Sequence, residues 1–292
     1  MAKAVQLQPS AQEPPKEIVL EKPREKPAES GQGDKEQPPS PSPSGNGKDK
    51  ALSLTDRTGK LLGLSEGLLL AEKYYEQGLI KTALGKLDWA IWSFNKAIEH
   101  DPRHVKAYVD RGAVYSSLRD HKTAIADYDR AIEIDPKFVA AYSSRGASKD
   151  ASGDRAGGLA DYNTALKINP RYVPAYINRG ALKQAAGDLQ GALSDLNAAI
   201  KINPERFEAY YNRGITKGGM GDFRGEIADY DQAIKLQPDF AHAYANRGLA
   251  KETLGDIRGA IADWEKTITI NPSLKSTIQP WVDAAKKKLH RR

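Results

Sequence analysis

Residues 174–204 read PAYINRGALKQAAGDLQGALSDLNAAIKINP, and they hold two helical patterns separated by Gly187 and Asp188. Glycine commonly follows the last residue of a helix and aspartate is a favoured N-cap, so this pair predicts a turn between two helices. Pro204 then ends the second helix, because proline lacks the backbone N–H that a helix interior needs. The stretch therefore predicts one helix-turn-helix unit.

The same unit recurs along the chain with a constant period. Its closing proline returns every 34 residues, at Pro102, Pro136, Pro170, Pro204, Pro238 and Pro272. A fixed period of this length indicates stacked structural repeats, each of which buries its apolar face against its neighbours. We therefore expect an array over residues 61–274, with repeats at 71–104, 105–138, 139–172, 173–206, 207–240 and 241–274.

Each repeat has small and aromatic residues at fixed places, numbered here with the residue 31 before the closing proline as position 1. At positions 4, 8, 20, 24, 27 and 32 the second repeat has Tyr108, Gly112, Ala124, Tyr128, Ala131 and Pro136. The pattern, which extends over 204 consecutive residues, resembles the tetratricopeptide repeat family. The resemblance implies an all-α fold, a right-handed superhelical solenoid of six helix-turn-helix repeats. It also implies a non-enzymatic scaffold or adaptor for protein partners.

The fifth repeat departs from this pattern at packing positions. Glu226 stands at position 20, where alanine is expected, and burying a carboxylate there is costly unless it is paired or reaches solvent. We interpret Glu226 as a local loosening, with a functional role as the alternative. Gly218 and Gly219, at positions 12 and 13, each cost about 1 kcal/mol of helix stability relative to alanine. They either leave room beside Tyr211 for a ligand side chain or reflect simple drift.

The two ends of the chain differ from the repeats. Residues 1–60 contain nine prolines and no aromatic residue, which predicts a disordered, proline-rich arm. Its run Pro38–Pro43 could dock an aromatic-lined groove, although a plain linker is the preferred interpretation. Residues 275–292 predict a capping helix with a basic tail, which starts at Pro280 and packs through Trp281, Ala285 and Leu289.

No constellation for catalysis or metal binding is present in the sequence. There is no cysteine, and the five histidines lie in no metal or catalytic-triad spacing: His100, His104, His121, His242 and His290. A phosphate-binding P-loop is absent, because six residues rather than four separate Gly78 from the Gly85-Lys86 pair. We expect no enzyme activity, no cofactor and no small-molecule substrate.

Arginine and aspartate occur together in the repeats. The five repeats with arginine at position 7 are the five with aspartate at position 23: Arg111, Arg145, Arg179, Arg213 and Arg247, with Asp127, Asp161, Asp195, Asp229 and Asp263. The first repeat has Gln77 and Ser93 instead. Joint occurrence predicts an ion pair between helices in preference to a row of phosphate-binding arginines.

The first helices of the family that these repeats resemble line a concave surface, and this implies candidate peptide-binding residues. Asn178, Asn212 and Asn246, at position 6, resemble an asparagine ladder that holds a peptide backbone, since a primary amide both donates and accepts hydrogen bonds. Asparagine is also the ordinary consensus residue at that position. The implied apolar contacts are Tyr75, Val109, Ile177, Tyr211, Ile215 and Leu249. A clamp for acidic chaperone tails is not indicated, because no residue at position 5 is basic.

Most of the net charge of +6 lies at the C-terminal end of the chain. Residues 61–272 hold 28 basic and 28 acidic residues, whereas residues 273–292 hold six basic residues and one acidic residue. The neutral repeats favour a protein or peptide partner over nucleic acid or a membrane. Self-association of the repeats is one alternative. Another is nucleic-acid or anionic-membrane binding through the basic tail, which comprises Lys286, Lys287, Lys288, Arg291 and Arg292.

The N-terminal residues predict no export. Residues 1–22, MAKAVQLQPSAQEPPKEIVLEK, lack the apolar run of about 7 to 15 residues that a signal peptide needs. No stretch of the chain approaches the roughly 20 apolar residues of a membrane span. We therefore expect a cytoplasmic protein.

Overall fold

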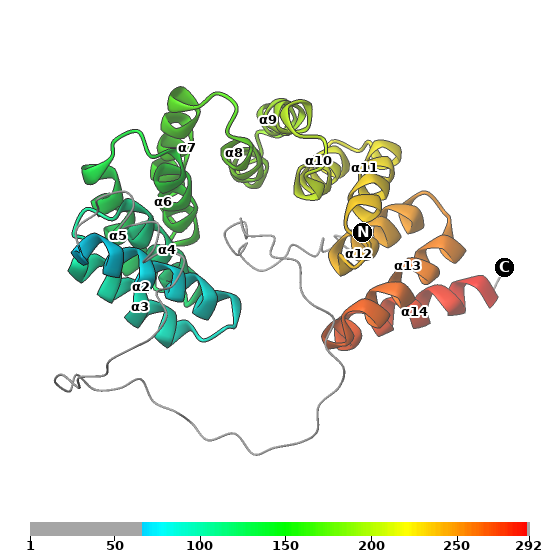
Figure 1. Cartoon of the computed structure of the whole chain (residues 1–292). Helices are drawn as coiled ribbons and strands as arrows, with labels where there is room; N and C mark the ends of the chain where they lie inside the picture. The colour runs from blue at the N-terminus through cyan, green and yellow to red at the C-terminus, as the bar shows by residue number, and fades with distance from the viewer. Residues whose placement is uncertain (1–65, 291–292) are drawn as a thin grey trace, which may run out of the picture. The chain divides into compact units, whose positions relative to one another are not determined.

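The computed structural model of the chain describes residues 66–290 and is drawn in Figure 1. Within this range the chain has thirteen α-helices, one short 3-10 helix and no strand, which confirms the predicted all-α class. These residues form two compact units, 66–152 and 153–290. The predicted arm, residues 1–60, lies outside the described residues, as do Arg291 and Arg292 of the predicted basic tail.

The N-terminal unit consists of two helical hairpins and one further helix. Its helices are α2 (Glu66–Ala83), α3 (Leu87–His100), α4 (Val105–Ser117), α5 (His121–Ile134) and α6 (Val139–Ala151). The α2–α3 crossing places Gly78 against the ring of Phe94, and the α4–α5 crossing places Gly112 against Tyr128. Both aromatic rings are almost wholly buried. The recurring aromatic residue therefore fills the space that the recurring glycine leaves between paired helices.

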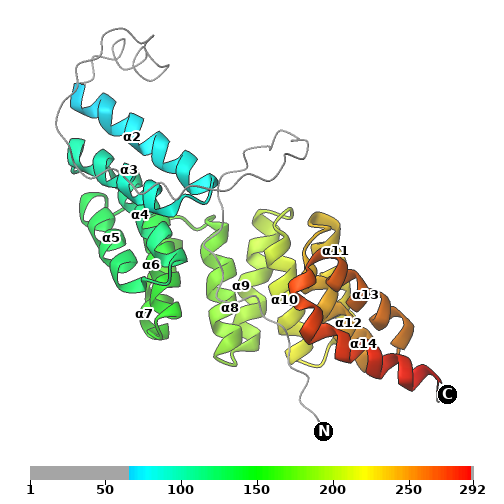
Figure 2. The same ribbon diagram turned by 90° about the horizontal axis from the view of Figure 1, so that it is seen from below.

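The C-terminal unit continues the same pattern and ends in a cap. Helices α8 and α9, α10 and α11, and α12 and α13 pair as hairpins, and α14 packs against α13 (Figures 1 and 2). Their bounds are α7 (Arg155–Ile168), α8 (Val173–Ala185), α9 (Leu189–Ile202), α10 (Phe207–Gly219), α11 (Phe223–Leu236), α12 (Ala241–Thr253), α13 (Ile257–Ile270), η1 (Pro272–Leu274) and α14 (Lys275–His290).

The turns inside the hairpins follow the predicted chemistry. Gly187 has a φ of 85°, a left-handed conformation that glycine adopts without steric cost, and the Asp188 side chain caps α9 by accepting the N–H of Gly191. The same combination precedes α7, α11 and α13. In the second repeat Arg119 takes the left-handed conformation, with a φ of 64°, and Asp120 still caps α5.

The capping helix begins earlier than the sequence predicts. Helix α14 starts at Lys275 and contains Pro280, so the expected start at Pro280 is wrong. Proline this close to the N-terminus removes one intrahelical hydrogen bond, and burial of Ile278 and Val282 offsets that loss, at about 1.5 to 3 kcal/mol for each side chain. Trp281 and Leu289 are only partly buried, whereas Ala285 is buried as predicted.

Candidate functional site

Six of the nine predicted site residues lie in the interior. Each has an exposed fraction of 7% or less: Val109, Ile177, Asn212, Tyr211, Ile215 and Asn246. Alanine at position 3 of α4, α10 and α12 is wholly buried, and so small a side chain lets neighbouring helices approach closely. Tyr75, Asn178 and Leu249 remain partly exposed. These three are therefore the predicted site residues whose side chains still reach solvent.

Two of the three ladder asparagines are engaged within the protein. Nδ2 of Asn212 donates to the carbonyl oxygen of Glu208, 2.8 Å away and one turn earlier in α10. Nδ2 of Asn246 donates to the hydroxyl oxygen of Tyr211 at 3.1 Å and so links α12 to α10. Asn178 is partly exposed on α8, and no hydrogen bond within residues 66–290 holds its amide. Of the three, Asn178 alone keeps its amide available for a peptide backbone in the part of the chain described.

Tyrosine hydroxyls link neighbouring first helices. Tyr75 donates a hydrogen bond of 2.7 Å to Oδ2 of Asp110. Burial, together with the Asp110 carboxylate, raises the pKa of Tyr75 above its ordinary value. Burial also raises the pKa of Tyr211, and the hydrogen bond from Asn246 opposes that rise. Both hydroxyls therefore stay neutral at physiological pH and serve as links between helices.

The side chain of Glu226 packs against Gly218 where α10 and α11 cross. Glu226 is 3% exposed, and a Cβ atom on Gly218 would lie 2.5 Å from its Oε2 and 2.7 Å from its Oε1. The carboxylate thus fills the space over Gly218, and its Oε1 accepts a hydrogen bond of 3.0 Å from the Tyr230 hydroxyl. The interpretation of Glu226 as a loosening is therefore wrong. The gap at Gly218 houses Glu226, so it is not room for a ligand beside Tyr211.

We expect the effect of Gly218→Ala on the free energy of unfolding to have opposite signs in the natural chain and in the Glu226→Ala variant. In the natural chain it should lower the free energy of unfolding by about 1 to 3 kcal/mol, because the new methyl group displaces a buried, hydrogen-bonded carboxylate. In Glu226→Ala it should raise that free energy by about 0.5 to 1 kcal/mol, because alanine favours the helix. Urea unfolding followed by circular dichroism measures both. Gly219→Ala is the control, since its Cβ would meet only ordinary contacts at 3.4 Å or more. An equal effect of Gly218→Ala in both backgrounds would contradict the packing described.

The predicted ion pairs between helices are confirmed in four repeats. An arginine binds the aspartate 16 residues later through Nε and Nη2, at 2.5 to 2.9 Å, in the pairs Arg111–Asp127, Arg179–Asp195, Arg213–Asp229 and Arg247–Asp263. Two parallel hydrogen bonds hold the planar guanidinium in one orientation. Burial raises the pKa of Asp127, and the Arg111 guanidinium opposes that rise.

Each of these arginines also reaches the preceding repeat. Its Nη1 donates to the residue at position 25 of that repeat, at 2.5 to 2.7 Å, in the pairs Arg111–Asn95, Arg179–Asn163, Arg213–Asn197 and Arg247–Asp231. In the last three repeats a lysine at position 11 also binds the aspartate, at 2.8 to 2.9 Å: Lys183, Lys217 and Lys251. The arginines of these four repeats are therefore engaged inside the fold, which disfavours a phosphate-binding row.

The basic tail is partly neutralised by the last repeat. Lys286 lies 2.7 Å from Oε1 of Glu265, and Lys288 lies 3.5 Å from Oε1 of Glu252. Glu265 stands at position 25, so Lys286 replaces the arginine that would join a following repeat. Both pairs are well exposed, and such pairs contribute at most about 1 kcal/mol. Their presence lowers the charge that the tail offers to a polyanion.

Residues 66–290 contain neither a metal-binding cluster nor a helix able to span a membrane. No group of three or more histidine, cysteine, aspartate or glutamate side chains in that range is placed to hold a metal ion. None of the helices there has both the length and the apolar character required to cross a membrane.

Family comparisons identify the repeats directly. Tetratricopeptide repeat models match residues 105–138 and 211–273, and a TPR repeat model matches residues 183–221. The chain is a tetratricopeptide repeat protein. Proteins of this family serve in general as non-catalytic scaffolds for protein–protein interaction, which agrees with the class predicted from the sequence. A comparison with curated proteins gives no match.

Solved structures share the fold at low sequence identity. A tetratricopeptide repeat protein from Parabacteroides merdae is 20% identical over 80% of this chain and 90% of its own, with a TM-score of 0.60. A thermophilic TPR protein of Thermus thermophilus is 19% identical over 62% of this chain and 98% of its own, with a TM-score of 0.55. The APC/C hetero-tetramer Cut9–Hcn1 gives 15% identity over 78% of this chain and 45% of the matched chain, with a TM-score of 0.69. At these identities the likeness concerns the fold alone.

Proposed function

We propose that the repeats bind a peptide or helix of a protein partner along the side formed by the first helices α8, α10 and α12. The observation that carries the proposal is Asn178, a partly exposed amide on α8 with no hydrogen bond inside the described part of the chain. An amide in this state can donate to one backbone carbonyl and accept from one backbone N–H of an extended peptide. Binding therefore requires no rearrangement of Asn178.

The pairing of the charged residues also supports the first-helix side as the binding surface. Arginine at position 7, lysine at position 11 and aspartate at position 23 are paired with one another in α8 to α13. The first helices also carry partly exposed residues outside these pairs: Asn178, Ala181, His242 and Leu249. Burial lowers the pKa of His242, so this side chain is neutral at physiological pH. A mixed apolar and neutral polar surface suits a polypeptide better than a polyanion.

We expect Asn178→Ala to weaken peptide capture about fivefold, which corresponds to the loss of about 1 kcal/mol of hydrogen bonding. Ala181→Arg should reduce capture at least about tenfold, because a long cationic side chain then covers the apolar part of this side. The probe is a library of random twelve-residue peptides displayed on phage, selected on the full chain. Enriched peptides are then synthesised and titrated against each variant.

The matched controls lie on the second helices. Gln190 of α9 and Ala228 of α11 are exposed, so Gln190→Ala and Ala228→Arg should leave capture unchanged. Asn246→Ala differs from both, since it removes a buried hydrogen bond to Tyr211 and should lower thermal stability. Equal capture by Asn178→Ala, Ala181→Arg and the natural chain would overturn the proposed side.

A further inference from the structure

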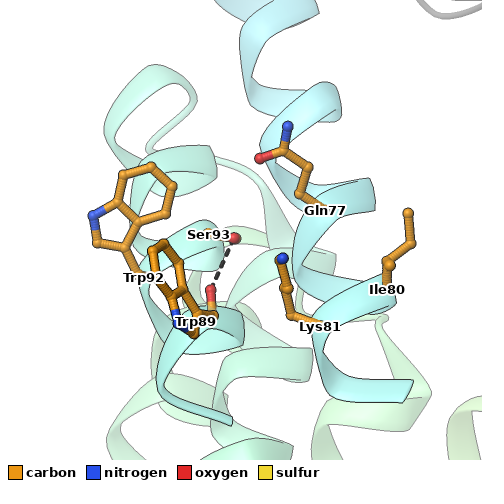
Figure 3. Close-up of a pocket in the computed structure, with 6 residues that line it drawn as sticks. All are labelled: Gln77, Ile80, Lys81, Trp89, Trp92 and Ser93. Atoms are coloured by element: carbon orange, nitrogen blue, oxygen red, sulfur yellow. Dashed lines mark hydrogen bonds between the residues drawn. The ribbon is translucent and has the colours of Figure 1, made fainter. Parts of the chain in front are cut away.

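The first hairpin holds a pocket of about 370 Å³ between its two helices (Figure 3). Helix α2 contributes Gln77, Ile80 and Lys81 to its lining, and helix α3 contributes Trp89, Trp92 and Ser93. All six residues belong to the N-terminal unit. The pocket is therefore a feature of one hairpin, separate from the first-helix side of α8, α10 and α12.

The pocket exists because the first repeat replaces the residues that form ion pairs in other repeats. Gln77 and Ser93 occupy positions 7 and 23, where later repeats have the paired arginine and aspartate. Trp89 and Trp92 occupy positions 19 and 22, where later repeats have only threonine or glycine and alanine or serine. Lys81 is at position 11, and its Nζ lies 5.7 Å from the centre of the Trp89 ring. An ionic contact has thus been exchanged for an aromatic surface with a cation beside it.

The two indoles form an angled aromatic pair. Their ring centres are 6.2 Å apart and their planes differ by 69°, while Tyr74 packs edge-on against Trp92 at 5.8 Å. Trp89 and Trp92 are both partly exposed, and Ile80 beside them is 56% exposed. No hydrogen bond between described residues uses either indole N–H or the Gln77 amide. The pocket therefore combines apolar ring faces with several available donors.

These properties match the requirements of a polyproline II segment. Such a segment has no internal hydrogen bonds, so its carbonyl oxygens need donors, and its proline rings pack on aromatic side chains. Tryptophan supplies both a ring face and an N–H donor. Segments of this type also lose little conformational entropy on binding, because proline already restricts the backbone.

The chain contains a segment of this composition, Pro38-Pro39-Ser40-Pro41-Ser42-Pro43, which lies outside the described residues. We propose that the tryptophan pocket binds this segment, residues 38–43 of the same chain. Asp34 and Glu36 flank Lys35 ahead of the prolines, and this net negative charge suits Lys81, which forms no ion pair among residues 66–290. A proline-rich peptide of another protein would have to displace the bound segment before it could occupy the pocket.

The length of the connecting chain suits this arrangement. Residues 44–65 provide a tether of 22 residues, and a flexible chain of that length would have a root-mean-square span of about 25 Å. Gln77 lies 11 residues beyond Glu66, which corresponds to about 16 Å along α2. The tether therefore reaches the pocket without being stretched. At this length the effective concentration of the segment at the pocket is on the order of 1 mM.

The test compares the full chain with a variant in which Pro38, Pro39, Pro41 and Pro43 are all replaced by alanine. We expect the indole ¹⁵N–¹H signals of Trp89 and Trp92 to shift between the two chains, while those of Trp264 and Trp281 stay in place. The probe is then a synthetic peptide of residues 33–46. It should bind the variant more tightly than the natural chain by a factor of 1 + (effective concentration)/Kd, which is about tenfold for a Kd of about 0.1 mM, because the tethered segment at about 1 mM competes with it.

The sister repeats supply the pocket control. Trp92→Ala introduces the residue that the second repeat has at the same position, Ala126, so the fold tolerates it. This change in the proline-to-alanine variant should abolish peptide binding and leave the helix content unchanged. Equal peptide affinity for the natural chain and the variant would overturn the assignment to the chain's own segment. Absence of any shift at Trp89 and Trp92 with added peptide would overturn proline-rich recognition altogether, whatever the behaviour of Trp92→Ala.

Discussion

Replacing Asp229 with alanine is expected to lower the free energy of unfolding by about 3 to 5 kcal/mol. Asp229 is 3% exposed and accepts hydrogen bonds from Nε and Nη2 of Arg213 at 2.9 and 2.6 Å. Nζ of Lys217 lies 2.8 Å from Oδ2 of Asp229. Without the carboxylate, two partly buried cations face each other with no anion between them. Urea unfolding at pH 7, followed by circular dichroism, measures the loss.

The control for this prediction lies two residues further along α11. Asp231 is half-exposed and accepts one hydrogen bond, from Nη1 of Arg247. Asp231→Ala should therefore cost less than about 1 kcal/mol, as exposed pairs do. The contrast depends on burial and on the number of partners, since the two side chains are chemically identical. A similar loss at both positions would show that the buried pair has no special weight.

Trp264→Ala is the second change with a large expected effect, and it should also lower the free energy of unfolding by about 3 to 5 kcal/mol. The Trp264 side chain is 1% exposed, and its Nε1 donates to the carbonyl oxygen of Ala245 at 3.1 Å. Its ring lies 5.8 Å from that of Trp281 and belongs to the cluster that also holds Ile278 and Val282 of α14. Truncation would leave a cavity beneath α14. The amides of α14 should therefore exchange with solvent faster than they do in the natural chain, and this acceleration should exceed that of the amides of α8 to α11.

Trp264→Phe is the matched control, because the first repeat has Phe94 at the same position. Phenylalanine keeps one aromatic ring against Gly248 but loses the hydrogen bond to Ala245 and the volume of the second ring, so we expect a cost of about 1 to 2 kcal/mol. Hydrogen exchange measured by mass spectrometry separates the two variants. Unchanged exchange of α14 in Trp264→Ala would mean that contacts other than Trp264 anchor the cap.

The fold could be predicted from the sequence because each local signal repeats and agrees with the others. Gly187 and Asp188 predict a turn and an N-cap, the prolines predict the helix ends, and the structure has both. The recurrence of Arg213 with Asp229 likewise predicts a contact that the structure contains. Such signals depend on backbone chemistry or on two complementary side chains, so they do not require knowledge of the packing.

The candidate site could be predicted only in part, because exposure depends on how closely helices pack. Asn178 and Asn246 share a repeat position, yet one is partly exposed and the other is wholly buried. The repeat position alone therefore does not determine whether the asparagine is exposed. The tryptophan pocket escapes prediction from the sequence for another reason. Its signal is the combined departure of Gln77, Ser93, Trp89 and Trp92 from the other repeats, and the first two alone indicate only a lost ion pair.

The bond from each arginine to the preceding repeat sets how strongly adjacent repeats unfold together. In a linear array, stability is a sum of terms for single repeats and coupling terms between neighbours. Asn95, Asn163 and Asn197 couple through a neutral amide, whereas Asp129, which accepts from Arg145, and Asp231 couple through half-exposed carboxylates. Salt screens exposed charge pairs more than neutral hydrogen bonds. Rising ionic strength should therefore reduce the cooperativity at the α5–α6 and α11–α12 junctions before it affects the junctions that use an amide.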